Sequence, residues 1–293
     1  MMLIRGKIFK KMYKGGPQLQ DEKMPIGVVV SGADPVASLE KVSSLGLSTC
    51  QMSVPPQSWW SEERIELIKK AVQEKGVRIS SLICGFEGES YRDIATIKRT
   101  VGLLNPSMRE ERVKKVFLFS DLAKRLEVKV LQAHIGFIPE EKDSSDYKGM
   151  VEAVQRIADC CRKNGQFFAL ETGQEPAKVL LGFIEDVARE SLKVNFDPAN
   201  MLLYDADDPI KALEILGKYV VGVHCKDGKR PEKKGELGKE FPLGEGEVGI
   251  ERFIAKLKEI GYEGPLTIER EISDEKRWKE DILRAKELLE KLR

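Results

Sequence analysis

Several residue types are scarce in this 293-residue chain, and each scarcity excludes a class of function. The only histidines are His134 and His224, which excludes any mechanism that needs three or more of them. The five cysteines form no Cys-x-x-Cys pair, so we expect no disulfide framework and predict a reducing, cytoplasmic compartment. No run of about eighteen apolar residues occurs, so no transmembrane helix and no membrane partner are expected.

Charge of one sign is also missing. Lys and Arg total 49 and Asp and Glu total 48, which argues against a chain-wide electrostatic attraction to nucleic acid. Residues 1–23 are basic but lack the continuous apolar stretch of a signal peptide. A flexible basic arm, a start codon assigned upstream of Met24 and residues added in cloning all fit them. We predict an N-terminal arm that has no part in the chemistry.

From residue 24 onward, a short apolar run is followed by a longer amphipathic segment, again and again. The runs are rich in Val, Ile, Leu and Phe without clean alternation, which is typical of strands buried on both faces of a parallel sheet. The predicted strands are Ile26–Ser31, Thr49–Val54, Val77–Cys84, Lys129–Ile135, Phe167–Glu171, Leu192–Asp197, Val220–His224 and Leu266–Ile268. This alternation predicts an α/β protein, a single (β/α)8 TIM barrel over residues 24–293.

Capping residues place the helices between these strands. We predict helices that begin at Asp34-Pro35, after Ser61, near Met108, Asp146 and Pro176, and at Asp208-Pro209, Ile250 and Asp274. An insertion with a short helical stretch, from Gly85 to about Ser107, and a polar loop, Asp227–Gly249, interrupt the pattern. A doubly wound open sheet is the alternative fold, but Ser31–Asp34 is a weak match to the Gly-rich turn it requires.

Polar side chains end the last four strands: Glu171, Asp197, His224 and Glu269. Active sites of such barrels lie at the carboxyl ends of the strands. A Glu at one strand end is commonly a helix cap or an ion-pair partner, but three carboxylates in one place repel unless a cation lies between them. Three oxygen ligands and one imidazole suit Mn²⁺, Mg²⁺ or Co²⁺, and suit Zn²⁺ less. We predict one bound divalent metal ion, with Mn²⁺ as the first choice.

Short motifs in the second half of the chain resemble the xylose-isomerase-like TIM-barrel superfamily of sugar phosphate isomerases and epimerases. This superfamily also contains the AP endonuclease family 2 enzymes. The resemblance extends from about Met24 to Arg293 and is specific mainly in the second half. The matching segments are Ala169–Thr172, Asn195–Asn200, Val223–Asp227, Pro242–Gly246 and Gly261–Glu269.

The resemblance to the D-tagatose 3-epimerase-like branch implies a metal-dependent ketose 3-epimerase. In that branch one metal is held by the residues that match Glu171, Asp197, His224 and Glu269. Glu171 and Glu269 would be the catalytic pair on opposite faces of a small-molecule sugar. One would remove the proton beside a metal-bound carbonyl, and the other would return a proton to the opposite face of the enediolate. The resemblance also implies a homodimer or tetramer.

Further residues are candidates for substrate contact. The resemblance places Arg230, Glu175 and Asn200 near the substrate, although Asn200 stands where several relatives have a histidine, and Arg230 is equally well explained as a solvated loop cation. His134 ends strand four and either faces the substrate or is a hydrogen-bonded histidine of the barrel mouth. Trp59 either stacks on a sugar or packs. The cations that could meet a substrate phosphate, or lie in solvent, are Lys226, Lys229 and Arg230.

Other functions remain open on the sequence. A lyase of the same superfamily, such as an inosose dehydratase, shares the metal and the proton abstraction but then expels a hydroxyl group. An AP endonuclease-like nuclease needs about five histidines, and the chain has two. A sugar-binding barrel without activity would be expected to lose at least one of the four ligand positions.

Overall fold

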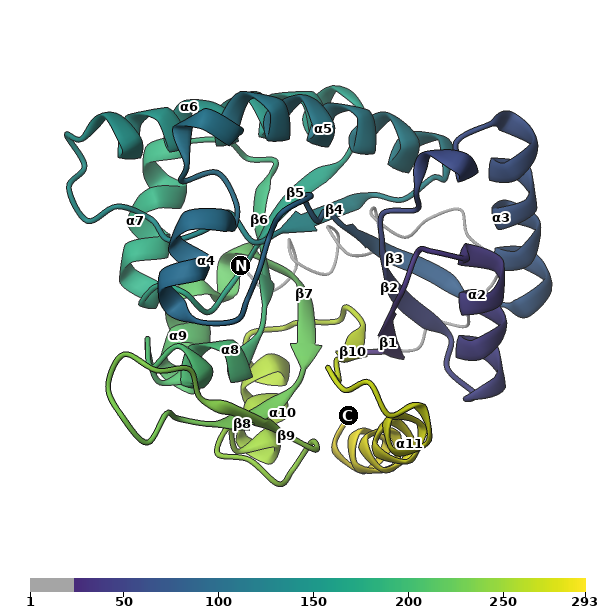
Figure 1. Cartoon of the computed structure of the whole chain (residues 1–293). Helices are drawn as coiled ribbons and strands as arrows, with labels where there is room; N and C mark the ends of the chain where they lie inside the picture. The colour runs from purple at the N-terminus through teal and green to yellow at the C-terminus, as the bar shows by residue number, and fades with distance from the viewer. Residues whose placement is uncertain (1–23) are drawn as a thin grey trace.

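The computed structural model describes residues 24–293, and the predicted arm at residues 1–23 lies outside the described residues. Eight parallel strands close into a barrel, in the order β1-β10-β7-β6-β5-β4-β3-β2, and helices surround it (Figure 1). This confirms the predicted (β/α)8 barrel. The strands are β1 (Ile26–Val30), β2 (Thr49–Ser53), β3 (Arg78–Ile83), β4 (Val130–Ala133), β5 (Phe167–Glu171), β6 (Leu192–Phe196), β7 (Val220–Cys225) and β10 (Leu266–Ile268).

The helices begin where short polar side chains can accept from free backbone N–H groups. The Ser61 hydroxyl accepts from Arg64 N at 3.3 Å ahead of α3, and Gly76 ends that helix in the left-handed conformation. The helices are α2 (Pro35–Ser44), α3 (Glu62–Lys75), α4 (Ile94–Thr100), α5 (Pro106–Arg125), α6 (Ser145–Lys163), α7 (Ala177–Val187), α8 (Pro198–Leu203), α9 (Pro209–Leu216), α10 (Ile250–Glu259) and α11 (Glu275–Leu292), with 3₁₀ turns η1 (Gln57–Trp59) and η2 (Gly217–Tyr219).

The hydrophobic core lies mainly between the strands and the surrounding helices, and a second, small cluster lies inside the barrel. Val130, Ala169 and Val221 form that inner cluster, with Phe167 packed against it. These residues are near the amino-terminal ends of their strands, so apolar packing closes that end of the barrel. The carboxyl end is left to polar side chains. Among residues 24–293, no helix has the combined length and apolarity that a membrane crossing requires.

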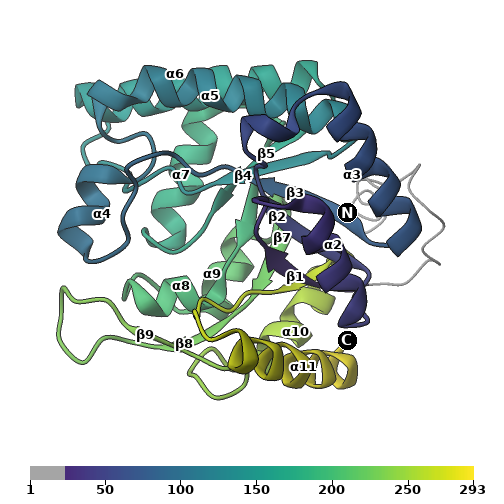
Figure 2. The same cartoon turned by 45° about the vertical axis from the view of Figure 1, so that its right-hand side comes forward.

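The predicted polar loop Asp227–Gly249 is not entirely a loop. It contains a short antiparallel hairpin of β8 (Asp227–Lys229) and β9 (Lys239–Phe241), which Figure 2 shows on the same side of the molecule as α4. Helix α8 was not predicted either, and α5 begins at Pro106 because the Asn105 side chain caps it. The hairpin strands are too short to show the alternation by which strands are recognised.

Asp227 organises the rest of this loop. Its carboxylate accepts from the backbone N–H groups of Gly228, Gly244, Gly246 and Val248, at 2.9–3.1 Å. A Cβ atom at position 246 would lie 2.1 Å from the Asp227 carboxylate, so only glycine fits there. The specific motif Pro242–Gly246 is therefore the framework of a loop held to the end of β7.

Candidate metal centre

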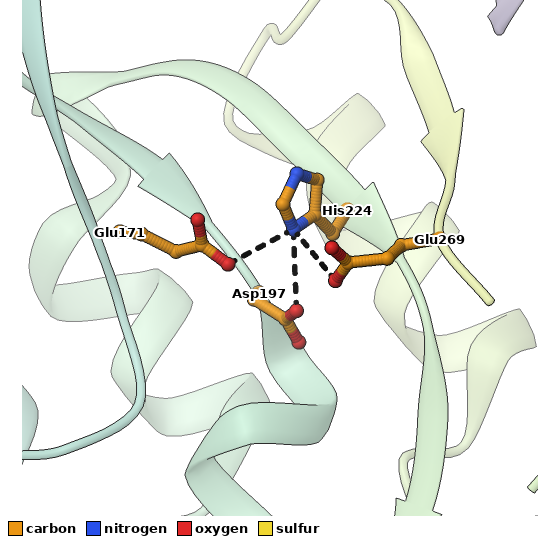
Figure 3. Close-up of side chains that lie close together, drawn as sticks. All are labelled: Glu171, Asp197, His224 and Glu269. Atoms are coloured by element: carbon orange, nitrogen blue, oxygen red, sulfur yellow. Dashed lines mark hydrogen bonds and ion pairs between the residues drawn. The ribbon is translucent and has the colours of Figure 1, made fainter. Parts of the chain in front are cut away.

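Four polar side chains converge at the carboxyl end of the barrel because they come from four neighbouring strands. Glu171 ends β5, Asp197 follows β6, His224 lies in β7 and Glu269 follows β10. Their ligand atoms lie within 4.8 Å of one another. His224 Nδ1 is 3.2 Å from Glu171 Oε1, 3.3 Å from Asp197 Oδ2 and 3.1 Å from Glu269 Oε2 (Figure 3).

The local backbone explains why Asp197 can point into this cluster. Its Oδ1 caps α8 by accepting from Asn200 N at 2.9 Å, which leaves Oδ2 facing His224. The Thr172 hydroxyl accepts from Asp197 N at 2.8 Å and donates to the Asp197 carbonyl oxygen at 3.0 Å. The strand-six carboxylate is therefore held from both its side chain and its backbone.

Burial and charge act against each other in the cluster. Burial alone would lower the pKa of His224, but the carboxylates of Glu269 and Glu171 raise it well above its usual range. Burial raises the pKa of Asp197 to about 6. Burial would also raise the pKa of Glu269, but His224 and Lys226 outweigh it and lower that pKa to about 2. Three carboxylates around one imidazole nitrogen favour a positive charge between them, from a proton or a metal ion. This donor set fits a hard or borderline divalent cation.

Two of the predicted substrate-binding residues contact the cluster. His134 Nε2 lies 3.3 Å from Glu171 Oε1, and the ring of Tyr91 lies 5.6 Å from the His134 ring. Burial would lower the pKa of His134, but the neighbouring Glu171 carboxylate raises it to about 8. The Asn200 side-chain amide donates to Glu171 Oε1 at 3.4 Å. Glu171 Oε1 therefore has a titratable neighbour and an amide neighbour in addition to His224.

Glu175 is buried beside the cluster strands and is hydrogen-bonded to the backbone. Its Oε1 accepts from the backbone N–H of Ile138 at 2.9 Å. Burial raises the pKa of Glu175 to about 7. Its predicted contact with a substrate stays a prediction.

Arg230 and Trp59 are engaged elsewhere. The Arg230 guanidinium donates to Asp205 Oδ1 at 2.5 Å and to the Asp207 carbonyl oxygen at 2.7 Å. The Trp59 indole N–H donates to the carbonyl oxygen of Ala33 at 3.2 Å. The structure therefore does not bring either side chain to the cluster, and their roles toward a substrate stay predictions.

Lys226 is buried against one of the four cluster residues. Its ammonium lies 3.0 Å from Glu269 Oε2 and 3.2 Å from Glu271 Oε1, and its side chain is 3% exposed. Burial would lower the pKa of Lys226, but Glu269 and Glu271 raise it well above its usual range. Lys229 packs its ammonium over the ring of Phe241 at 4.5 Å. The cations considered for a substrate phosphate are therefore all occupied within the chain.

Sequence reasoning missed two groups of residues near the site. Tyr91, from the β3–α5 insertion, faces His134, and Phe137 packs edge-on against Tyr204 at 6.1 Å. The second group is the pair of buried amides Gln51 and Gln132, on the inner side of His224. The available signal was a glutamine in the middle of each of two predicted strands, Thr49–Val54 and Lys129–Ile135.

The family model of the xylose isomerase-like TIM barrel matches residues 39–291. The chain belongs to this family. A solved xylose isomerase domain protein from Planctomyces limnophilus is 41% identical, with a TM-score of 0.89 over 92% of this chain and 98% of that chain. The family resemblance inferred from the sequence is therefore confirmed.

Further relatives of the xylose isomerase-like chain include sugar epimerases. L-ribulose-5-phosphate 3-epimerase of Escherichia coli is 22% identical over 85% of this chain and 87% of its own length. D-psicose 3-epimerase of Clostridium cellulolyticum H10, solved with D-tagatose, has a TM-score of 0.70 at 18% identity, over 92% of this chain and 99% of that chain. The protein MJ1311 of Methanocaldococcus jannaschii is 28% identical, and the match spans 64% of this chain and 65% of that protein.

Proposed function

We propose that the protein is a divalent-metal-dependent sugar epimerase that acts on the carbon beside a ketose carbonyl, as a ketose 3-epimerase does. The observation that carries this proposal is the placement of the Glu171 and Glu269 carboxylates on two sides of one imidazole nitrogen (Figure 3). Carboxylates on opposite sides of a bound sugar can reach opposite faces of one carbon. That arrangement suits inversion at a single centre.

The residues that would hold the metal are Glu171, Asp197, His224 and Glu269. When bound, a divalent ion would polarise the substrate carbonyl and stabilise negative charge on its oxygen. Mn²⁺ is the proposed ion, with Mg²⁺, Co²⁺ and Zn²⁺ as alternatives, because the donor set is rich in oxygen and contains no thiolate. A solved member of this fold from Mycobacterium smegmatis, in complex with magnesium, has a TM-score of 0.66 at 19% identity, over 89% of this chain and 96% of that chain.

The two glutamates would move the protons. One carboxylate removes the proton from the carbon beside the carbonyl, which leaves an enediolate, and the other returns a proton to the opposite face. His134 Nε2 lies against Glu171 and Lys226 against Glu269, so each carboxylate has a cationic or titratable neighbour that holds it in place. The direction of transfer depends on which epimer is bound.

The test is turnover in D₂O, followed by NMR, on ketoses, ketose phosphates and inososes with the Mn²⁺-loaded protein. We expect deuterium at the carbon beside the carbonyl together with a new epimer, and no turnover by Glu171→Gln or Glu269→Gln. Glu236→Gln, an exposed carboxyl of the hairpin loop, is the matched control and should behave as wild type.

The other outcomes discriminate between functions. Loss of water without a new epimer would move the assignment to a lyase of the inosose dehydratase type. No exchange on any compound, despite stoichiometric Mn²⁺, would refute the ketose reaction. The proposed cytoplasmic location agrees with five cysteines that are all free thiols in the structure. The homodimer or tetramer implied by the resemblance remains a proposal that light scattering would check.

A further inference from the structure

Three amide side chains fill the interior of the barrel directly below His224. Gln51 lies on β2, Gln132 on β4 and Asn195 on β6, and each is at most 2% exposed. In such barrels, every second strand contributes one inward-pointing residue to each layer of the interior. Such a layer is usually apolar. Polar groups are costly to bury unless they are hydrogen-bonded, so we expect these buried amides to be hydrogen-bonded partners of a functional group.

The amides bond to one another and to the inner nitrogen of His224. Gln51 Oε1 is 2.7 Å from His224 Nε2 and also accepts from the Gln132 amide at 2.7 Å. The Gln51 amide nitrogen in turn donates to Asn195 Oδ1 at 3.0 Å. Asn195 Nδ2 is 3.1 Å from His224 Nε2. Both ends of the Gln51 amide are therefore committed.

These contacts determine which atom of Gln51 meets His224. If the Gln51 amide alone were turned over, its NH₂ group would face the NH₂ group of Gln132, and its oxygen would face the oxygen of Asn195. Both contacts would be repulsive, so Gln132 and Asn195 hold the Gln51 oxygen toward the ring. Within residues 24–293, Gln51 Oε1 is the one acceptor and the shortest contact at His224 Nε2, since the NH₂ groups of Asn195 and Gln132, at 3.1 and 3.5 Å, can only donate. The 2.7 Å contact with Gln51 therefore favours a proton on Nε2, which leaves Nδ1 for a metal ion.

Strand β7 leaves room for this layer. A Cβ atom at position 222 would lie 2.4 Å from Asn195 Oδ1 and 3.4 Å from the Gln51 amide nitrogen. Gly222 therefore lets the amides approach His224 across the barrel. A larger residue at this position would displace Asn195 and, through it, Gln51.

We propose that Gln51, held by Gln132 and Asn195, is a positioning residue that presents Nδ1 of His224 to the metal. The inference rests on the metal site of the proposed function, and it adds a part of the chain outside the four ligands. Partners of this kind hold the ring and the tautomer of a ligating histidine, and their loss typically weakens metal binding roughly 10- to 100-fold.

The experiment is calorimetric titration of Mn²⁺ into the metal-stripped full-length protein. Gln51→Met keeps the length of the side chain but removes the acceptor, and its Mn²⁺ affinity should fall roughly 10- to 100-fold. Gln51→Glu keeps an acceptor toward His224 and, with the Asn195 amide turned over to donate to its second oxygen, should restore most of the affinity. Ser80→Ala is the matched control, because it removes another buried hydrogen bond of the barrel, to the Cys50 carbonyl oxygen, without touching His224.

A second readout separates positioning from a structural effect. With only two histidines in the chain, ¹⁵N-histidine labelling of the Zn²⁺-loaded protein gives few signals, and a His134→Gln variant assigns them. Wild type should show a proton on Nε2 and a metal-shifted Nδ1, and Gln51→Met should lose this single state. If Gln51→Met does not fold, Gln132→Met, which removes the donor that holds Gln51, should show the same change to a smaller extent.

The outcomes separate the two proposals. Wild-type Mn²⁺ affinity and an unchanged Nε2–H signal in Gln51→Met would overturn the positioning role while leaving the enzyme proposal intact. Weakened binding in Gln51→Met, without sugar turnover by wild type, would support positioning and refute the epimerase. A wild-type protein that binds neither Mn²⁺ nor Zn²⁺ would overturn both.

Discussion

Replacing Glu175 by glutamine should stabilise the protein, and more so as the pH rises. Burial raises the pKa of this carboxyl from 4.5 to about 7 in the folded chain. Between these pH values the native state keeps a proton that the unfolded chain has lost, so folding stability decreases as pH increases through this window. At about 1.4 kcal/mol per pH unit, the wild-type protein loses about 3 kcal/mol by pH 7.

The amide introduced by Glu175→Gln carries no titrating group and keeps an oxygen that can accept from Ile138 N. Urea unfolding of metal-free wild type, Glu175→Gln and the exposed control Glu280→Gln at pH 4 to 8.5 measures the difference. Below pH 4.5, we expect the free energies of unfolding of Glu175→Gln and wild type to be nearly equal. Above pH 7, that of Glu175→Gln should be about 3 kcal/mol larger, which corresponds to roughly 5–10 °C in Tm. A gain independent of pH, or a loss above pH 7, would show that Glu175 is ionised at no cost in the fold.

The remaining predictions concern the metal centre and its neighbours. Removing the metal with a chelator should lower the free energy of unfolding by about 2.7 kcal/mol, compared with the protein at a free Mn²⁺ concentration 100 times its Kd. A melting curve that changes with neither chelator nor Mn²⁺ would contradict the metal site. Lys226→Met should destabilise the metal-free protein by about 3 kcal/mol in urea unfolding, because Glu269 loses its ammonium partner, whereas Lys226→Met combined with Glu269→Gln should recover most of the loss. Free ketoses should be turned over with higher kcat/KM than their phosphates, because Lys226 and Arg230 are already paired; the reverse order in the NMR assay would show that another cation receives the phosphate.

The fold was predictable because its strongest signals are local. Buried strands produce short apolar runs, and caps such as Ser61 mark helix starts within a few residues. Helix α8 has a comparable signal, Asp197-Pro198, but Asp197 also ends the predicted strand Leu192–Asp197, which hides its role as a helix cap. The β8–β9 hairpin had none, since each strand is three residues long and its order depends on Asp227 and distant backbone groups.

The four cluster residues were predictable for a different reason. Neighbouring parallel strands bring their carboxyl ends together, so residues that are distant in sequence become adjacent by topology alone. Contacts that depend on side-chain direction were not predictable. Gln51 meets Gln132 across 81 residues and Asn195 across 144, and no spacing rule connects them. Trp59 follows a strand as predicted, yet its indole bonds to Ala33.

The hydrogen bonds to Asp227 hold the base of the long segment after β7 but do not involve its tip, residues 231–236. The loop from Gly244 to Val248 is tied to Asp227, and the far strand of the hairpin is anchored through Glu240, which accepts from Arg270 next to Glu269. Residues 231–236, which lie between strands β8 and β9, are mostly exposed. We therefore expect that residues 231–236 can be replaced or lengthened, in the laboratory or in evolution. The four cluster residues at the ends of the barrel strands should keep their positions.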